Sequence, residues 1–236
     1  MHYIVLPESQ VKRRLSFYLA MEEYVARHLD VADCFFLWQV EPTVIFGRNQ
    51  SVGNEVNEDY CRQHQIQLFR RKSGGGCVYA DEGNLMLSFV TDGEQVGLAF
   101  NRFVNMLLLV LRRMGVEAVG TSHNDVLIGD RKVSGTACYH LPGRSIVHGT
   151  LLYDTTMEHM LQAITPSEEK LEQKGIKSVR QRITLLRDHV ALSLEEVKIL
   201  IRQTLCDDEL VLTPSDVTAI AQIENNYLRD EFIHLL

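Results

Sequence analysis

The sequence has little of what marks several classes of protein. Its five cysteines are odd in number and include no CxxC pair, so it has neither a disulfide framework nor a common zinc or redox motif. Its longest apolar run, Met106 to Leu111, is too short to cross a bilayer. The first residues lack a basic segment followed by a long apolar stretch, so no signal peptide is indicated. We therefore expect a cytoplasmic protein with reduced thiols and no membrane partner.

The sequence also has fewer basic than acidic residues. The 236 residues include 24 Lys and Arg against 31 Asp and Glu, which gives a formal net charge of -7. An acidic surface argues against a protein whose main partner is nucleic acid, so any anion site must be a local feature. The sequence has no internal repeat, and its 45% hydrophobic content is typical of a globular protein with a substantial core.

Apolar residues at helical spacing predict a helix over Ser16–Leu29. The clearest helical pattern covers Leu98–Met114 and is followed by Gly115, a residue suited to the left-handed position that closes many helices. The stretch Ser193–Leu205 opens with the spacing of a capping box and predicts another helix. A further helix is expected to begin at Pro214.

Runs rich in β-branched and aromatic residues predict strands through the first two thirds of the chain. Cys34–Val40 and Thr43–Phe46 are separated only by Glu41-Pro42, which favours a hairpin. Gly129-Asp130 falls between two later runs, as a tight hairpin turn would. The other expected strands are Ile66–Phe69, Leu85–Val90, Val116–Val119, Asp125–Ile128, Lys132–Ala137 and Ile146–Tyr153. Because no Pro/Gly/Ser-rich linker divides the chain, the pattern indicates one α+β domain with helical C-terminal elements.

The most informative local feature is the run Arg70-Arg71-Lys72-Ser73-Gly74-Gly75-Gly76, directly after an expected strand. Successive glycines allow a ligand to approach the backbone, and free N–H groups in such a loop can cradle an anion. Arginine and lysine would add positive charge. The run matches neither GxGxxG nor GxxxxGK[ST], and a flexible surface turn explains it about equally well.

Two further residues stand in β-rich runs. Lys132, in Lys132-Val133-Ser134-Gly135, would aim an ammonium into a pocket if its strand faces one, although a surface lysine is the commoner occupant of such a position. His148, followed by Gly149-Thr150, is more often a packed core residue than an acid or base, and the sequence identifies no partner for it. Neither residue alone indicates a reaction.

Taken in order, these features resemble the lipoate–protein ligase A family, within the superfamily of biotin and lipoate ligases and octanoyltransferases. The match covers roughly residues 3 to 190 at family-like spacing. Each motif is weak alone, whereas the ordered set is specific. The segments that carry the resemblance are Leu19-Ala20-Met21-Glu22-Glu23, Phe46-Gly47-Arg48-Asn49-Gln50, Arg70 to Asn84, Asn124-Asp125, Gly129 to Ala137, His148-Gly149-Thr150-Leu151-Leu152 and Lys174-Gly175-Ile176-Lys177-Ser178-Val179-Arg180.

The resemblance implies a mixed, largely antiparallel sheet flanked by helices, as in the catalytic domain of biotin and lipoate ligases. Residues 1–190 would form the catalytic core, and residues 191–236 would add helical elements to the same domain. It implies a ligase that uses ATP and Mg²⁺ to convert lipoate to lipoyl-AMP and then transfers the lipoyl group to a lysine of an apo lipoyl domain. Acceptors of this kind are the E2 subunits of 2-oxoacid dehydrogenases and the H protein of glycine cleavage.

The resemblance also assigns site residues. Lys132 matches the family's catalytic lysine, whose ammonium would stabilise negative charge on the α-phosphate and on the acyl oxygen. Phosphates and water would hold most of the Mg²⁺ coordination, so no metal ligand is assigned. The residues expected to bind substrate or nucleotide are Arg71, Ser73, Gly74, Gly75, Gly76, Cys77, Val78, Tyr79, Asn84, Asn124, Asp125, Ser134, Gly135, His148 and Gly149.

Two departures from the family bear on activity. Many of its ligases have a histidine where this chain has Ala80, a difference expected to alter nucleotide handling or acyl preference. Many also continue into a small C-terminal domain, which we expect this chain to lack. Some relatives receive that part as a separate small accessory subunit, and some use pre-formed lipoyl-AMP. Both differences concern the adenylation step more than the transfer step.

Three alternatives stay open. A cysteine-dependent octanoyl or lipoyl transferase would form a thioester, but the two places where that nucleophile occurs hold no cysteine here. Cys77 and Cys138 lie near the motifs, and packing is the simpler explanation of each. A biotin ligase would carry a GRGR-type loop in place of RRKSGGG. A binding subunit that needs a partner for turnover would be expected to have lost part of the glycine loop, Asp125 or Lys132.

Overall fold

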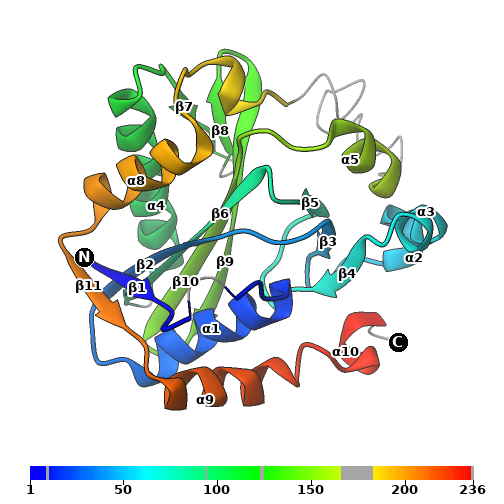
Figure 1. Ribbon diagram of the computed structural model, residues 1–236, viewed down its shortest axis with the longest axis horizontal. Coiled ribbons are helices and arrows are strands. Elements are labelled where there is room, and N and C mark those ends of the chain that lie inside the picture. Colours follow the sequence, from blue (N-terminus) through cyan, green and yellow to red (C-terminus); the bar gives the residue numbers. More distant parts are fainter. Residues whose placement is uncertain (9–10, 94, 123–124, 166–182, 235–236) are drawn as a thin grey trace.

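Figure 1 shows the computed structural model, in which a large twisted sheet has helices on both faces and a smaller sheet beside it. The structure describes residues 1–8, 11–93, 95–122, 125–165 and 183–234. Over these residues the large sheet has the strand order β11-β1-β2-β6-β10-β9-β8-β7. It is antiparallel except where β1 lies parallel to both β2 and β11. Its strands are β1 (His2–Val5), β2 (Asp33–Trp38), β6 (Asn84–Asp92), β7 (Val119–Gly120), β8 (Asp125–Ile128), β9 (Arg131–Leu141), β10 (Arg144–Leu152) and β11 (Asp208–Val211).

The smaller sheet has the order β4-β3-β5, with β3 parallel to β4 and antiparallel to β5. Its strands are β3 (Thr43–Phe46), β4 (Gln67–Arg70) and β5 (Val78–Ala80). The helices are α1 (Leu15–His28), α2 (Val52–Glu55), α3 (Glu58–Gln63), α4 (Val96–Arg113), α5 (Met157–Ala163), the 3-10 turn η1 (Leu186–Asp188), α8 (Leu194–Leu205), α9 (Pro214–Glu224) and α10 (Asp230–His234).

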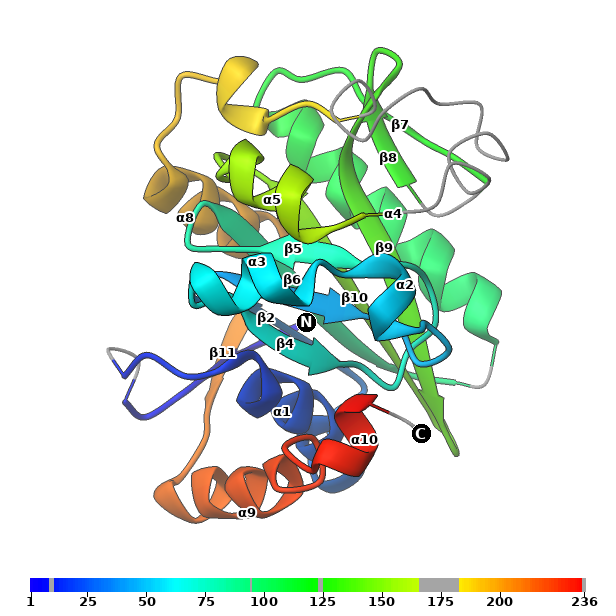
Figure 2. The same cartoon turned by 90° about the vertical axis from the view of Figure 1, so that its right-hand side faces the viewer.

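The central strand β6 divides the core into two layers, because successive side chains of a strand point to opposite faces. Met86 and Val90 pack in the layer under α1 and α9, whereas Leu85, Leu87 and Phe89 pack in the layer under α4 and α8. Figures 1 and 2 show these helix pairs on opposite faces of the large sheet. A third cluster fills the space between the smaller sheet, α3 and α5. The predicted α+β architecture with a largely antiparallel sheet is confirmed.

The long helical patterns are confirmed as α1, α4, α8 and α9, each within two residues of its predicted start. Gly115 has a φ of 79° and donates its N–H to Arg112, while Val116 donates to Leu111. These two hydrogen bonds form a Schellman motif, which closes α4. The prediction of a strand over Val116–Val119 is therefore mostly wrong, because the helix closure uses its first residue and only Val119 joins β7.

The predicted hairpin between Cys34–Val40 and Thr43–Phe46 is wrong. The two strands exist as β2 and β3, but Glu41-Pro42 carries the chain from the large sheet to the smaller one. Each strand lies between two other partners, since β2 pairs with β1 and β6 and β3 pairs with β4 and β5, so neither has an edge left for the other. The hairpin predicted at Gly129-Asp130 is confirmed, since β8 and β9 are antiparallel and Gly129 has a φ of 61°.

Several elements were not predicted, among them β1, β5 and β11. The C-terminal segment 191–236 was expected to be helical, and it also supplies β11, which extends the large sheet beside β1. The motif Lys174–Arg180 and Asn124 lie outside the described residues. Within the part of the chain that the structure describes, no helix is long and apolar enough to span a membrane.

Candidate active site

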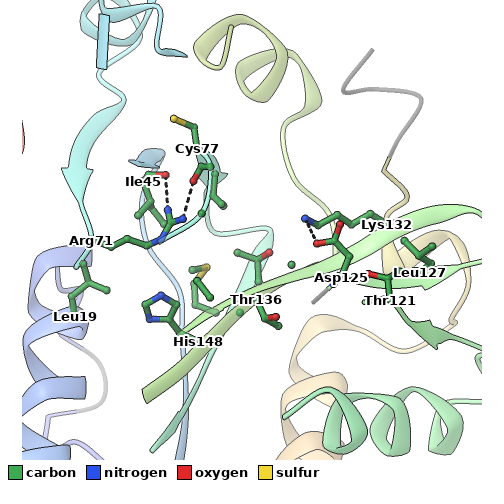
Figure 3. Close-up of a pocket in the computed structure, with 18 of the residues that line it drawn as sticks. Leu19, Ile45, Arg71, Cys77, Thr121, Asp125, Leu127, Lys132, Thr136 and His148 are labelled. Atoms are coloured by element: carbon green, nitrogen blue, oxygen red, sulfur yellow. Dashed lines mark hydrogen bonds and ion pairs between the residues drawn. The ribbon is translucent and has the colours of Figure 1, made fainter. Parts of the chain in front are cut away.

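A pocket of about 620 Å³ opens between the two sheets, within the size range of small-molecule sites. Figure 3 shows Leu19, Ile45 and Arg71 on one side of it and Asp125 and Lys132 on the other. One part of the lining is apolar and comes from α1, β2, β3, β5, β6 and β9. Its residues are Leu19, Trp38, Ile45, Val78, Met86 and Ala137. The pocket can therefore hold a molecule with an apolar segment and a charged segment.

Arg71 organises the glycine loop that forms one wall. Its guanidinium is buried and donates to the carbonyls of Gly74 at 2.7 Å, Gly76 at 2.9 Å and Ile45 at 3.2 Å. Its Nε donates to Ser73 Oγ at 3.0 Å. Burial lowers the pKa of Arg71 to about 10, which still leaves the group protonated at neutral pH. The arginine thus holds the loop from inside instead of extending freely into solvent.

These contacts orient the loop amides. A trans peptide places its N–H opposite its C=O, so turning the carbonyls of Gly74 and Gly76 toward Arg71 turns the amides of Gly75 and Cys77 away from it. Gly75 has a φ of 95°, a conformation that favours glycine. Gly75, Gly76 and Cys77 all line the pocket. The loop therefore has the composition of a backbone anion cradle.

The neighbouring loop after β3 supports this arrangement. A Cβ on Gly47 would lie 2.1 Å from the carbonyl oxygen of Gly75, so only glycine permits the close approach. Arg48 N–H also donates to the carbonyl of Ser73 at 2.9 Å. The fully buried Arg70 donates to the carbonyls of Gly47, Arg48 and Gln50, and its Nε donates to Ile233 of α10. The two loops and the C-terminal helix therefore form one connected unit.

Lys132 faces the glycine loop from β9. Its ammonium lies 2.7 Å from Asp125 Oδ1 on β8, and both side chains are largely buried. The register between β8 and β9 shifts at Val126/Leu127, and such a bulge re-aims a side chain. A Cβ on Gly135 would lie 2.5 Å from Lys132 Nζ. The missing side chain at Gly135 therefore creates the space in which the ammonium lies.

His148 of β10 contacts residues from two other elements. Its Nε2 lies 2.7 Å from Ser73 Oγ in the glycine loop, and its Nδ1 lies 2.9 Å from Glu22 Oε2 on α1. The next residue, Gly149, is also confined, since a Cβ there would lie 3.0 Å from the ring of Phe103. The sequence identified no partner for His148, and the structure supplies two.

The structure brings many of the predicted site residues to the pocket. Those that line it are Arg71, Gly75, Gly76, Cys77, Val78, Asp125, Lys132, Gly135, His148 and Gly149. Ser73, Gly74, Tyr79, Asn84 and Ser134 are not among the lining residues. Ser73 and Gly74 instead contact Arg71, as described above.

Three of these five residues have surroundings that explain their place. Tyr79 is buried in the cluster under the smaller sheet, and Asn84 donates from Nδ2 to the carbonyl of Tyr79 and to Thr155 Oγ1. Ser134 is fully buried on β9. All three are buried in the protein and are not exposed in the pocket.

The lining also contains residues that the sequence did not predict. Trp38, Ile45 and Met86 contribute apolar surface, and Thr121 and Asp130 contribute polar groups. Leu19 belongs to the segment Leu19-Ala20-Met21-Glu22-Glu23, which contributes to the family resemblance. Nothing in that segment shows which helix face meets the pocket. Strand alternation could have indicated that Trp38 and Met86 share a face, once the pairing of β2 with β6 was known.

Four of the five cysteines have few features of nucleophiles. Burial raises the pKa of Cys138 to about 11, and that of Cys34, Cys61 and Cys206 likewise to about 11. Cys77 lines the pocket and donates from Sγ to Glu55 Oε2 at 3.6 Å. A thiol with a raised pKa is mostly protonated at neutral pH, which disfavours thioester chemistry.

The acidic groups of the pocket do not form a protein metal site. Among the described residues, no group of three or more His, Cys, Asp or Glu side chains could hold a metal ion. Asp125 and Asp130 line the pocket, and Asp125 forms the ion pair with Lys132.

Comparisons with known proteins identify the family of this chain. Residues 15–206 match the family model described as the lipoyl protein ligase A/B catalytic domain. Lipoate–protein ligase 1 of Staphylococcus aureus is 36% identical over 219 residues, covering 89% of this chain and 67% of the relative. The lipoate–protein ligase LplJ of Bacillus subtilis is 40% identical over 168 residues, covering 70% of this chain and 50% of the relative. The chain thus spans between half and two thirds of the length of these curated relatives.

A solved structure extends the similarity to the fold. The bi-partite lipoate protein ligase of Thermoplasma acidophilum, described with its E2 lipoyl domain, superposes with a TM-score of 0.85 at 25% identity. The superposition covers 100% of this chain and 96% of that chain. The glycine loop, Lys132 and His148 lie within residues 15–206, the range that the family model matches. The chain therefore belongs to the lipoyl protein ligase A/B catalytic-domain family.

Proposed function

We propose that this protein is a lipoate–protein ligase. In the first step a carboxylate oxygen of lipoate attacks the α-phosphorus of ATP, and pyrophosphate leaves. In the second step a lysine amine of an apo lipoyl domain attacks the acyl carbonyl of lipoyl-AMP. The amide C–N bond forms, the bond from the acyl carbon to AMP breaks, and the amine loses a proton.

The observation that carries this proposal is the placement of Lys132 across the pocket from the glycine loop. Both steps develop negative charge, on the α-phosphate and then on the acyl oxygen. A fixed ammonium in a partly enclosed site stabilises such charge, and the loss of one such group costs about 10²–10³ in rate. Asp125 holds the ammonium in place at 2.7 Å, and the glycine loop forms the opposite wall.

The apolar lining fits the remainder of the substrate. Leu19, Trp38 and Met86 are available to contact an alkyl tail and its dithiolane ring. Burial of a methylene group contributes about 0.8 kcal/mol, so a chain of several methylenes adds binding energy far from the reacting carboxylate. The acyl group and the nucleotide would thus occupy different parts of one pocket.

The acceptors we propose are apo lipoyl domains of E2 subunits and the H protein, and the site of action is the cytoplasm. Mg²⁺ would accompany ATP as a phosphate-bound ion. Residues 1–190 would act as the catalytic core, with residues 191–236 as supporting elements. A separate small accessory subunit would be required only if the chain alone fails to form lipoyl-AMP.

Intact mass spectrometry of the acceptor tests this proposal. The purified chain is incubated with an apo lipoyl domain and either lipoate with Mg-ATP or synthetic lipoyl-AMP. A lipoyl mass gain in both mixtures supports a complete ligase, and a gain with lipoyl-AMP alone indicates a transferase that needs an activating partner. Lys132→Ala should remove the gain from both mixtures while circular dichroism stays unchanged. If the wild-type chain gives no gain in the first mixture and none in the second, the proposal is overturned.

A further inference from the structure

Glu22 is a buried carboxylate that the proposed reaction does not use. It belongs to α1 and is only 3% exposed. Ser88 Oγ donates to its Oε1 at 2.5 Å, and Trp38 Nε1 in turn donates to Ser88 Oγ at 2.8 Å. A buried carboxylate requires hydrogen-bond donors, and the second oxygen of Glu22 faces His148 Nδ1 at 2.9 Å.

The same histidine reaches the glycine loop with its other nitrogen. His148 Nε2 lies 2.7 Å from Ser73 Oγ, which accepts from Arg71 Nε at 3.0 Å. Ser73 is 2% exposed and is not among the lining residues, so the substrate cannot reach its hydroxyl in this arrangement. The Ser73–His148–Glu22 contacts resemble those of a hydrolase triad in geometry, but this burial argues against a nucleophilic serine.

The chemistry of the two ends fixes the direction of the hydrogen bonds that Glu22 accepts, and it leaves the Ser73–His148 bond to the state of the histidine ring. The indole of Trp38 and the guanidinium of Arg71 can only donate, and an ionised Glu22 between them can only accept. Ser88 therefore passes its hydrogen to Glu22. Ser73 accepts from Arg71, and its own hydrogen has an acceptor in His148 Nε2 only when that nitrogen carries no hydrogen. His148 Nδ1 then carries the ring hydrogen and donates it to Glu22.

We propose that Glu22 is a positioning residue of the lipoyl-AMP site, and that it acts by holding His148 as the neutral Nδ1–H tautomer. This inference rests on the proposed function for its kinetic consequence only. With that tautomer, His148 Nε2 accepts the Ser73 hydrogen and keeps the Ser73 oxygen turned toward Arg71. Arg71 in turn orients the carbonyls of Gly74 and Gly76. The carboxylate on α1 thereby stabilises the anion-binding form of the loop.

Glu22→Gln is the informative change, because the two side chains have nearly the same shape. If the glutamine keeps the hydrogen bond from Ser88, its amide group faces His148 and donates to Nδ1. The ring hydrogen must then move to Nε2 and point at Ser73. The Ser73 oxygen would accept from both neighbours, and its own hydrogen would lose its acceptor. The substitution thus reverses the tautomer without removing atoms from the core.

Nitrogen NMR of histidine-labelled protein measures this directly at neutral pH, because protonated and unprotonated ring nitrogens differ widely in chemical shift. His148 is assigned by comparison with His148→Gln. The wild type should show the Nδ1–H tautomer, and Glu22→Gln should show Nε2–H. The matched control is Glu23→Gln, a buried carboxylate on the same helix that contacts Lys72 and Arg27. It should leave the His148 tautomer unchanged.

The kinetic arm uses lipoyl transfer from synthetic lipoyl-AMP to an apo lipoyl domain. Glu22→Gln should raise KM for lipoyl-AMP about tenfold while kcat changes less than threefold, because a loosened loop weakens phosphate binding before it affects the ammonium of Lys132. A purely structural role would lower the active fraction, and so kcat, without changing KM.

An Nε2–H or doubly protonated His148 in the wild type, or an unchanged tautomer in Glu22→Gln, would overturn the assigned role of Glu22. An unchanged KM with a reversed tautomer would overturn its effect on the loop. Absence of transfer by the wild type would contradict the proposed ligase function and leave the tautomer result standing.

Discussion

Replacing Gly135 with alanine tests whether the position of the Lys132 ammonium, and not merely the presence of a lysine, determines the rate. The added Cβ would lie 2.5 Å from Lys132 Nζ, 2.7 Å from its Cε and 3.6 Å from Asp125 Oδ1. The first two distances are well inside van der Waals contact. Since Nζ is the end of a flexible side chain, the lysine should move and the strand should stay.

The expected result is a loss of rate with little loss of stability. Moving the ammonium out of its 2.7 Å contact with Asp125 removes most of its effect on the reaction, so lipoyl transfer should fall by about 10²-fold, close to the effect of Lys132→Ala. Gly135 does not have a positive φ, and an alanine in place of such a glycine changes stability by about 0.4–1 kcal/mol through the unfolded state. The melting temperature should therefore stay within a few degrees of the wild type.

The assay is the single-turnover rate of lipoyl transfer from lipoyl-AMP, followed by mass spectrometry of the acceptor. The control is Gly97→Ala, because a Cβ added to Gly97 would meet open space and the residue lies in α4, outside the pocket lining. It should retain wild-type transfer. Near-normal transfer by Gly135→Ala would refute the reasoning, since the lysine would then work from a displaced position.

Two substitutions and one labelling experiment test other parts of the protein. Arg71→Lys keeps the charge but cannot reproduce the four hydrogen bonds that Arg71 makes from three nitrogens, so lipoyl transfer should fall at least tenfold. Activity equal to the wild type would contradict the role given to Arg71 in the loop. Arg70→Ala leaves several buried carbonyls without a donor and should lower the free energy of unfolding by at least about 3 kcal/mol in urea titrations. With its pKa raised to about 11, Cys138 should be alkylated about a hundredfold more slowly at pH 8 than a thiol of pKa 9. The rate of alkylation should rise as the pH rises toward 11. Rapid labelling at pH 8 would show a reactive thiolate.

The fold was predictable where periodicity decides the outcome. The apolar spacing of α4 and the glycine that follows it predicted both the helix and its closure, because these depend on residues close in sequence. Strand partners do not depend on local sequence. Glu41-Pro42 looked like a hairpin turn, yet β2 pairs with β6 and β3 pairs with β5, and only the packing of the whole chain selects those partners.

The candidate site follows the same division. The glycine loop and Lys132 each belong to a short run of consecutive residues, Arg70–Gly76 and Lys132–Gly135. The order of such runs along the sequence was enough to name them as candidate site residues. The contact between His148 and Glu22 joins residues 126 positions apart, and no local pattern pairs them. The apolar lining from Trp38 and Met86 depends on the register of β2 against β6, which sequence reasoning did not supply.

The basic residues of the glycine loop show why a charge pattern alone misassigns roles. From the sequence, Arg71 and Lys72 are candidate partners of an anion. In the structure Arg71 donates to carbonyls of its own loop, and Lys72 pairs with Glu23 at 2.5 Å. On the opposite wall the basic side chain that lines the pocket is Lys132, which pairs with Asp125. An anion bound here would therefore be recognised through backbone amides whose direction Arg71 sets, so the loop would select its ligand by geometry as well as by charge.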